Sequence, residues 1–388
     1  EWEDFTLGEL FEVLTSKKRF DANKVQVFED GKNPYVVRTS SNNGQRGFID
    51  EDELYLNDGN TISFGQDTAT MFYQEKPYFT GDKIKILKAK NKKFNKNNSQ
   101  FFISTMAKAF SAFSWGSSSF NVSIIENQKL TLPTQNGEID FAFMENFIAE
   151  LEAERIAELE AYLRVTGLSD YILTEEERAV LEAFRSGKIS WGGVKLPNGQ
   201  EVTNIEWKMF RIEDVLEWQP QKEIDPLKLE KLKDVNKKLY PFYGQATINN
   251  GIISYNQLVD EVLNNKEGKS TILIHSNNQN TVYLETPFYL KDGHGATSVL
   301  QSEKLNKLNA LYFMSSIKKV ILSKYSYNAK ATKIELKNTL ISLPSSQGVP
   351  LYAYMEVFIK AVQKLVIKEV VEYADRKIAA TREVVTKT

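Results

Sequence analysis

The sequence of 388 residues contains no cysteine and only two histidines, His275 and His294. The absence of cysteine excludes a disulfide framework and any zinc or iron–sulfur site that is held by thiolates. With two histidines, a metal site would have to be built from oxygen ligands, and a nucleophilic triad has little support. We therefore expect this chain to bind no metal and no cofactor of its own.

Long apolar runs are also missing. No stretch of about 18 apolar residues occurs, so the sequence predicts no transmembrane helix. The first residues, Glu1 to Asp4, do not resemble a secretory signal, and because residue 1 is not Met we expect a few residues to precede it. Together with the absence of cysteine, these features favour a cytoplasmic location.

Each partial match to a catalytic motif in the sequence lacks a residue that the motif requires. Gly268–Ser270 ends like a phosphate-binding loop, but Leu263 stands where that loop needs a glycine. Asn33–Tyr35 lacks the second proline of an adenine methyltransferase motif, and Glu335 and Lys337 have no defined acidic partner upstream for a nuclease site. The sequence therefore predicts a non-catalytic protein.

The net charge of −2 hides an uneven distribution. Residues 1–135 carry 17 basic and 17 acidic side chains, and residues 136–206 carry 6 and 15. Residues 207–345 carry 19 and 14, and residues 346–388 carry 7 and 5. The acidity lies in one middle segment and the second large block is basic, which is compatible with phosphate binding there.

The chain repeats itself at an offset that drifts only from 205 to 211 residues. Four ordered matches at nearly one offset indicate an internal duplication, which decides the architecture. The matching pairs are Trp2–Phe11 with Trp207–Leu216, Asn33–Gly44 with Leu239–Gly251, Tyr73–Phe79 with Tyr283–Tyr289, and Leu130–Ile148 with Ile341–Ile359.

Each copy has a mixed part followed by a helix. Short β-branched and aromatic runs separated by Asn-Gly and Asp-Gly turns predict strands, and helical spacing recurs near the end of each mixed part. The fold class is thus α+β: two repeated mixed α/β domains separated by two long antiparallel coiled-coil helices. The expected parts are residues 1–135, 136–204 (helix, short capped helix and linker), 205–346 and 347–388.

The two long helices show apolar positions that alternate four and three residues apart, which is typical of a coiled-coil seam. Helices of about 30 residues span roughly 40–45 Å, or about a dozen base pairs of DNA. A simpler alternative is that each helix only covers its own domain. The predicted seam comprises Met144, Ile148, Leu151, Leu159 and Tyr162, with Arg155 as a polar member, and Met355, Ile359, Val362, Val366, Val370 and Tyr373.

Polar loops recur at equivalent places in both copies but differ in sequence. Their Arg, Lys, Asn, Gln, Ser and aromatic side chains are the types that contact phosphates and base edges. His294, between two glycines, fits a DNA contact and an ordinary turn equally well, whereas His275 fits a core position. The candidate DNA-binding residues are Lys17, Lys18, Arg19, Arg38, Ser41, Asn42, Gln45, Arg46, Gln66, Thr68, Trp115, Ser117, Ser118, Asn121, Gln219, Lys222, Tyr243, Gln245, Thr247, Asn277, Asn278, Gln279, His294, Tyr325, Tyr327, Asn328, Lys330 and Lys333.

The repeated starts at Trp2–Phe11 and Trp207–Leu216, and the repeated exits into a helix at Leu130–Ile148 and Ile341–Ile359, resemble specificity subunits of type I restriction–modification systems. The specificity subunits of type IIB systems have the same plan. The resemblance covers essentially the whole chain and rests on its architecture, with no catalytic signature.

This resemblance implies that each domain is a target recognition domain that reads one half of a split, asymmetric site in double-stranded DNA. The helices would fix the gap between the halves and dock DNA methyltransferase subunits, which bind S-adenosylmethionine, and a restriction or translocase subunit would complete the complex. Two other interpretations stay open on the residues alone: a duplicated protein-binding adaptor, and a stand-alone DNA-modifying enzyme.

Overall fold

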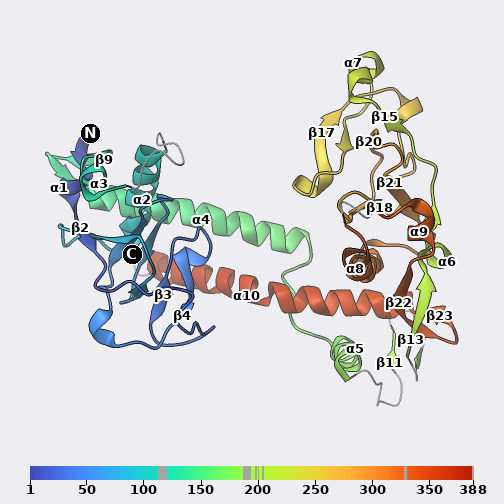
Figure 1. Ribbon diagram of the computed structural model, residues 1–388, viewed down its shortest axis with the longest axis horizontal. Helices are drawn as coiled ribbons and strands as arrows, with labels where there is room; N and C mark the ends of the chain where they lie inside the picture. Colours follow the sequence, from blue (N-terminus) through green and yellow to red (C-terminus); the bar gives the residue numbers. More distant parts are fainter. Residues whose placement is uncertain are drawn as a thin grey trace. The chain divides into compact units, whose positions relative to one another are not determined.

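The computed structural model describes residues 1–111, 120–186, 194–196, 199, 201–202, 205–326 and 330–386. The chain divides into two compact units (Figure 1). The first unit comprises Glu1–Ala161 with Lys377–Thr388, and the second comprises Tyr162–Arg376. Each unit contains both helices and sheets, so the α+β class is confirmed.

The first unit contains three small sheets. Its first strand, β1, pairs with β9 near the end of the mixed region, which brings the two ends of that region together. In strand order, the sheets are β1 (Trp2–Thr6), β9 (Lys129–Gln135) and β10 (Glu138–Ile139); β2 (Phe11–Thr15), β8 (Ile84–Ala89), β5 (Thr61–Gly65) and β6 (Met71–Gln74); and β4 (Gln45–Phe48), β3 (Pro34–Val36) and β7 (Phe79–Thr80).

The second unit has the same three sheets, with one strand more in the last. These are β13 (Glu206–Arg211), β22 (Leu340–Ser346) and β23 (Val349–Pro350); β14 (Glu217–Trp218), β21 (Thr297–Gln301), β18 (Thr271–His275) and β19 (Asn280–Leu284); and β15 (Glu223–Ile224), β20 (Tyr289–Lys291), β16 (Tyr240–Tyr243) and β17 (Ile252–Asn256). A separate hairpin joins β11 (Val194–Lys195) and β12 (Glu201–Val202).

The helices follow the same order in both units. The first unit has α1 (Leu7–Leu10), η1 (Asn42–Gly44), η2 (Glu53–Tyr55), α2 (Lys96–Phe110), α3 (Val122–Glu126) and α4 (Phe141–Val165), whose last residues belong to the second unit. The second unit has α5 (Glu175–Ser186), α6 (Ile212–Val215), η3 (Pro226–Lys228), α7 (Leu229–Leu232), η4 (Asn249–Gly251), η5 (Asp260–Val262), α8 (Lys307–Lys324), α9 (Lys333–Lys337) and α10 (Tyr352–Thr386), whose end belongs to the first unit.

The repeated motifs of the sequence fall on equivalent positions. Trp2 lies opposite Pro133 in one sheet, and Trp207 lies opposite Pro344 in the other. The two Asn-Asn-Gly segments form the same left-handed turn, with φ of 52° at Asn43 and 51° at Asn250. Asparagine tolerates this region better than most residues, which explains why this residue type recurs at the turn.

The long helices begin inside the hydrophobic cores. Met144 of α4 is fully buried with residues of β5, β8 and α2. Met355 and Ile359 of α10 are buried in the corresponding core of the second unit with residues of α8. These members of the predicted seam therefore pack within the units. At their starts, the two helices cover their own domains, which was the simpler alternative to a coiled-coil seam.

A pair of asparagines ties each mixed region to its long helix. The capping box at the start of α2 places Asn95 Nδ2 and Asn98 Nδ2 at 2.8 and 2.9 Å from Glu145 Oε1 of α4. In the second unit, Asn306 Nδ2 and Asn309 Nδ2 lie 2.7 and 3.2 Å from Glu356 Oε1 of α10. We call these two arrangements the asparagine clasps.

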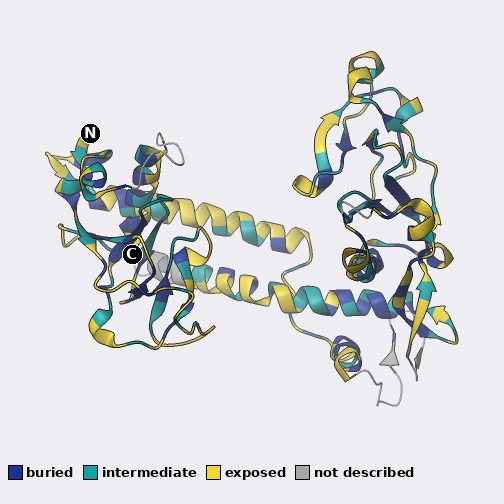
Figure 2. Ribbon diagram, viewed as in Figure 1, coloured by how far each residue is buried: buried dark blue, intermediate teal, exposed yellow. Residues whose placement is uncertain are grey.

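The middle of α10 differs from the predicted seam (Figure 2). Val366, Val370 and Tyr373 are 73%, 38% and 46% exposed, whereas Val371 and Ala374 are 5% and 2% exposed. The four–three spacing is present, but the buried positions lie one residue later in the sequence than the predicted ones. The sequence could not decide which positions are buried, because two apolar stripes run side by side along the helix. The pairs are Val366-Ile367, Val370-Val371 and Tyr373-Ala374. In α4, similarly, Leu151 and Tyr162 are 41% and 59% exposed, Ile148 and Leu159 are half-buried, and Leu163 is buried.

The predicted short helix after Thr174 is α5, and its expected capping box is present. Within the second unit, α5 packs on the start of α10, where the hydroxyl of Tyr354 donates to the carbonyl of Val180. Lys364 Nζ lies 2.9 Å from Asp170 and 3.1 Å from the buried Glu177. The acidic segment thus holds α5 against α10 through apolar and ionic contacts.

Candidate nucleic-acid interface

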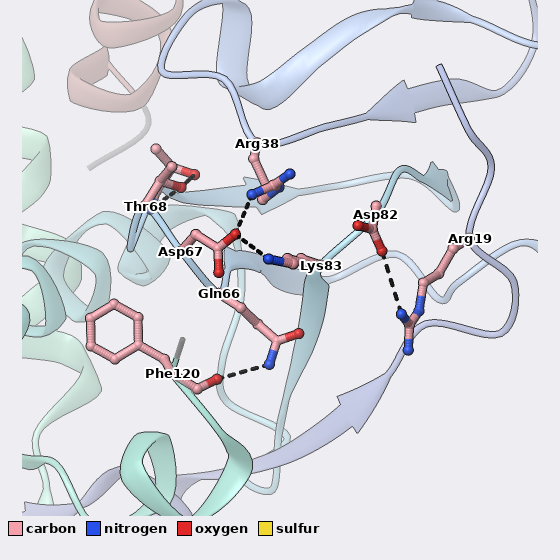
Figure 3. Close-up of polar contacts among 9 residues, drawn as sticks. Arg19, Arg38, Gln66, Asp67, Thr68, Asp82, Lys83 and Phe120 are labelled. Atoms are coloured by element: carbon pink, nitrogen blue, oxygen red, sulfur yellow. Dashed lines mark hydrogen bonds and ion pairs between the residues drawn. The ribbon is translucent and has the colours of Figure 1, made fainter. Parts of the chain in front are cut away.

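Three turns of the first unit meet at one end of its sheets (Figure 3). They are the turn after β3 (37–41), the tip of the β5–β6 hairpin (66–70) and the turn before β8 (81–83). Arg38 Nη1 lies 2.5 Å from Asp67 Oδ2, and Lys83 Nζ lies 2.8 Å from the same oxygen. One carboxylate therefore joins cations from the other two turns.

The same three turns meet in the second unit. They are residues 244–248 after β16, 276–279 between β18 and β19, and 292–296 before β21. Asn278 Nδ2 donates to the carbonyl of Gln245 at 2.6 Å, and the amide of Ser276 donates to the carbonyl of Ala296 at 2.8 Å. Candidate residues from separate parts of the sequence, among them Gln245, Asn278 and His294, are thus brought together.

The segment that precedes α3 joins the cluster in the first unit, whereas in the second unit the start of α9 contacts the residues before β15. In the first unit, Gln66 Nε2 donates to the carbonyl of Phe120 at 2.8 Å, and the amide of Phe120 donates to the carbonyl of Gln66. In the second unit, Lys333 Nζ donates to Gln221 Oε1 at 3.1 Å, and Lys330 is exposed nearby in sequence. The candidates Trp115, Ser117, Ser118, Tyr327 and Asn328 lie outside the described residues.

A basic groove of about 660 Å³ lies beside the turns of the first unit, and Arg19, Arg38 and Arg46 all line it. Arg19 Nη1 is 3.4 Å from Asp82 Oδ1, so it is held toward the groove by an exposed ion pair. The hydroxyl of Tyr35 donates to the carbonyl of Phe20 at 2.6 Å beneath it, and burial raises the pKa of Tyr35. Guanidinium groups in a groove suit phosphates and base edges.

The two lysines before Arg19 are exposed next to this groove. Lys18 Nζ lies 4.3 Å from the centre of the Tyr55 ring and 4.7 Å from that of Phe20, a cation–π arrangement that positions its charge. The backbone amide of Lys17 donates to Asn57 Oδ1 at 3.1 Å, which leaves its side chain on the surface.

In the second unit, the side chain of His294 is 95% exposed, in a turn with φ of 55°. Glu223 Oε2 accepts the amides of Gly293 and Gly295 at 3.2 and 3.1 Å, which fixes this turn. Lys222 is exposed, and its backbone amide donates to Asn264 Oδ1. Sequence reasoning missed Glu223 and Lys83, because each acts through a partner more than fifteen residues away.

Several candidates stabilise the fold instead. Tyr243 is 4% exposed and packs edge-on against Phe288, so the expectation that it contacts DNA is corrected by its burial. The same holds for Tyr325, which is 8% exposed with its hydroxyl 3.3 Å from Thr339 Oγ1. Apolar strand ends and aromatic turn residues look alike in sequence, which explains both errors.

Two polar candidates also have structural roles. Gln279 is 7% exposed, has φ of 55° and donates to the carbonyl of Ser276, so it closes its own hairpin. Asn121 caps α3 by accepting the amide of Ile124 at 2.9 Å. Ser41, Asn42 and Thr247 are exposed in or beside the converging turns, whereas Gln45, Thr68 and Asn277 there, and Gln219 next to β14, are partly buried.

No set of three or more acidic or histidine side chains that could hold a metal occurs in the described part of the chain. Among the helices of the same residues, none is long and apolar enough to cross a membrane.

Comparison with known proteins decides between the remaining interpretations. The family described as "type I restriction modification DNA specificity domain" matches residues 1–161 and again 204–373. The chain belongs to this family. It is therefore a specificity subunit of a restriction–modification system, a DNA-recognition component and not a catalyst, and the adaptor and stand-alone enzyme are not favoured.

Two relatives extend this result. The specificity subunit S.BcgI of a type II restriction enzyme from Heyndrickxia coagulans is 24% identical over 377 residues, which cover 95% of this chain and 96% of the relative. The crystal structure of a type I system S subunit from M. genitalium matches 99% of this chain and 94% of its own, with a TM-score of 0.57 at 15% identity. The latter likeness concerns the fold alone.

Proposed function

We propose that this specificity subunit reads a bipartite, asymmetric site in double-stranded DNA, with one half read by each unit. The observation that carries the proposal is the convergence of the same three turns in both units with different side chains. A scaffold that is kept twice while its turns diverge suits the reading of two different half-sites. We also infer that the chain arose by internal duplication.

We infer that the long helices pair as a coiled coil and dock DNA methyltransferase subunits. The four–three spacing of the buried positions in α10 supports the pairing. The net charge of −9 over residues 136–206 supports a surface that faces protein and not DNA. S-adenosylmethionine would be bound by the methyltransferase and not by this chain, a restriction or translocase subunit would join the complex, and the cytoplasm is the compartment that such a complex needs.

The lengths of the two long helices set the expected number of base pairs between the two half-sites. α4 has 25 residues and α10 has 35, which correspond to roughly 37 and 52 Å at 1.5 Å per residue. At 3.4 Å per base pair, this range spans about 11 to 15 base pairs. The two recognised halves would then lie about one turn of the duplex apart.

The test is a binding selection with the assembled complex. The chain would be co-expressed with the methyltransferase encoded beside it, and the purified complex would select from random duplexes at several salt concentrations. Enrichment of two short motifs at a fixed distance is the expected result. A complex that assembles but enriches no sequence at any salt concentration would contradict DNA reading and return the protein-binding adaptor to first place.

A further inference from the structure

Equivalent backbone hydrogen bonds give a residue-by-residue alignment of the converging turns. After β3, the amide of Val37 donates to the carbonyl of Gly44, and after β16, the amide of Gly244 donates to the carbonyl of Gly251. The next residue in each turn is Arg38 in the first unit and Gln245 in the second. These two side chains therefore start from the same point of the scaffold.

The other two turns align in the same way. The amide of Gln66 donates to the carbonyl of Lys83 at 3.0 Å, and the amide of Ser276 donates to the carbonyl of Ala296 at 2.8 Å. Lys83 therefore corresponds to Ala296, and Asp67, which follows Gln66, corresponds to Asn277. An arginine, an aspartate and a lysine in the first unit stand where the second unit has two carboxamides and an alanine.

Besides ion pairs elsewhere, such as that of Lys88 with Asp58, the first unit gathers several cations at this cluster. Residues 1–135 have no net charge, yet Arg38, Lys83, Arg19 and Arg46 gather at the turns and the groove beside them. Residues 207–345 have an excess of five positive charges, yet the three turns of that unit contain no lysine or arginine, and Lys291 precedes the third turn. The guanidinium cluster is therefore not a result of general basicity.

The position of Arg38 is fixed by its neighbours. Its side chain is 32% exposed and lines the groove, while Asp67, 28% exposed, accepts from Nη1. Lys83 binds the same carboxylate oxygen and holds Asp67 in place (Figure 3). A carboxylate on one side of a guanidinium fixes the plane of the group and directs its other N–H donors away from the ion pair.

We propose that Arg38, positioned by Asp67, selects a guanine in the half-site that the first unit reads, and that the second unit, with Gln245 at this point, selects no guanine there. This inference rests on the bipartite reading proposed above. Guanine presents two acceptors, O6 and N7, to the major groove, and the planar fork of arginine can donate to both. Adenine presents an acceptor and a donor, which a carboxamide such as that of Gln245 matches.

The experiment is the same binding selection, performed on the complex with Arg38→Lys, Arg38→Gln and Asp67→Asn chains. Arg38→Lys keeps a cation beside Asp67 but loses the planar fork that Asp67 orients, so it would lower the preference for one guanine by a part of the roughly 5- to 150-fold that one bidentate contact contributes. Arg38→Gln would move the preference at that base pair toward adenine. Asp67→Asn would lower the same preference while weak, sequence-independent binding at low salt increases, because one negative charge is lost.

Two variants serve as controls. Lys17→Ala, at an exposed lysine beside the groove that does not contact Asp67, would weaken binding to all sequences similarly and lower the salt dependence, as expected for a phosphate contact, and Gln245→Ala would leave the guanine preference unchanged. Thermal unfolding of each chain would establish that it folds. A bipartite motif in which no guanine depends on Arg38, or in which Gln245→Ala removes the same guanine, would overturn the inference and leave the bipartite reading intact. The absence of any motif would overturn both.

Discussion

His275 ends β18 with its side chain fully buried. Its Nδ1 lies 2.9 Å from Thr297 Oγ1, and its Nε2 has no hydrogen-bond partner among the described residues. Burial lowers the pKa of His275 to about 4, because a charged imidazole would lose its hydration there. The sequence predicted a core position for this residue from its apolar neighbours, and this is confirmed.

The low pKa of His275 makes the second unit sensitive to acid. In the unfolded chain, histidine binds a proton near pH 6.5, so the stabilisation is complete above that pH. It is lost as pH falls toward about 4, where the folded form also becomes protonated, and the total loss is about 3 kcal/mol. In urea unfolding across this range, His275→Gln would show a smaller loss of stability than the natural chain.

The exposed His294 provides the matched control for this titration. Replacing it with alanine removes a histidine from the same unit without changing the core, and the loss of stability with acid should stay as in the natural chain. If His275→Gln and the natural chain lost stability equally between about pH 6.5 and pH 4, buried His275 would not be the sensor.

For single residues, the sequence predicts which side-chain types the candidate site contains better than it predicts which of those side chains are exposed. Arg19 in an isolated bridge, Arg38 in the turn after β3 and Arg46 in β4 come from separate elements and line one groove, and their contact with DNA stays a prediction. Tyr243 and Tyr325 had the same kind of sequence context, but their rings fill the core. Whether an aromatic residue at a strand or helix end turns inward depends on its packing partners, such as Phe288, which are distant in the sequence.

The asparagine clasps determine how each mixed region is fixed to its long helix. Asn98 and Asn309 are fully buried, so their side-chain amides depend on the acceptors of Glu145 and Glu356. Replacing Glu145 with alanine leaves a buried donor without that acceptor, at a cost of about 1–3 kcal/mol. Urea unfolding should show this loss in the first unit.

Glu145→Gln is the matched variant for the clasp, because it keeps an oxygen acceptor at the same position. Its loss of stability should be clearly smaller than that of Glu145→Ala. The equivalent pair at Glu356 should behave in the same way in the second unit. Because glutamine keeps both the shape and an oxygen acceptor, equal losses for alanine and glutamine at both positions would show that the clasp depends on the negative charge of the carboxylate and not on an oxygen acceptor as such.

Substitutions at two adjacent valines test which positions of α10 are buried. Val371 is 5% exposed and Val370 is 38% exposed. Val371→Asn removes a buried apolar side chain and buries a polar one, which should cost about 2–3 kcal/mol, whereas Val370→Asn should cost less than about 1 kcal/mol. Thermal unfolding followed by helical circular dichroism would measure both, and a larger effect at Val370 would restore the frame predicted from the sequence.

At the scale of elements, local patterns could be predicted and long-range register could not. The capping box of Thr174 and Glu177 and the Asn-Asn-Gly turns are formed by neighbours in sequence. The meeting of Arg38, Asp67 and Lys83 depends on the pairing of β5 with β8 and on the parallel pairing of β3 with β7. No local sequence signal contains those registers.

The whole molecule combines two family matches, residues 1–161 and 204–373, in one chain. The repeated starts and exits made this architecture predictable, because short motifs that pair with each other, such as Trp2 with Pro133, must be kept in both copies. The exact extents of the parts, 1–135, 136–204, 205–346 and 347–388, stay a prediction. So does the coiled-coil pairing, which depends on how the two long helices meet.

Each unit is proposed to read one half of the site. The most direct measurement is binding selection by the complex with the natural chain and with two altered chains. One carries Arg38→Ala and Arg46→Ala in the first unit, and the other carries Gln245→Ala and Asn277→Ala in the second. We expect a bipartite motif for the natural chain, and each altered chain should lose base preference in a different half while keeping the other. Loss of both halves from either chain, or a single continuous motif that both chains weaken, would contradict it.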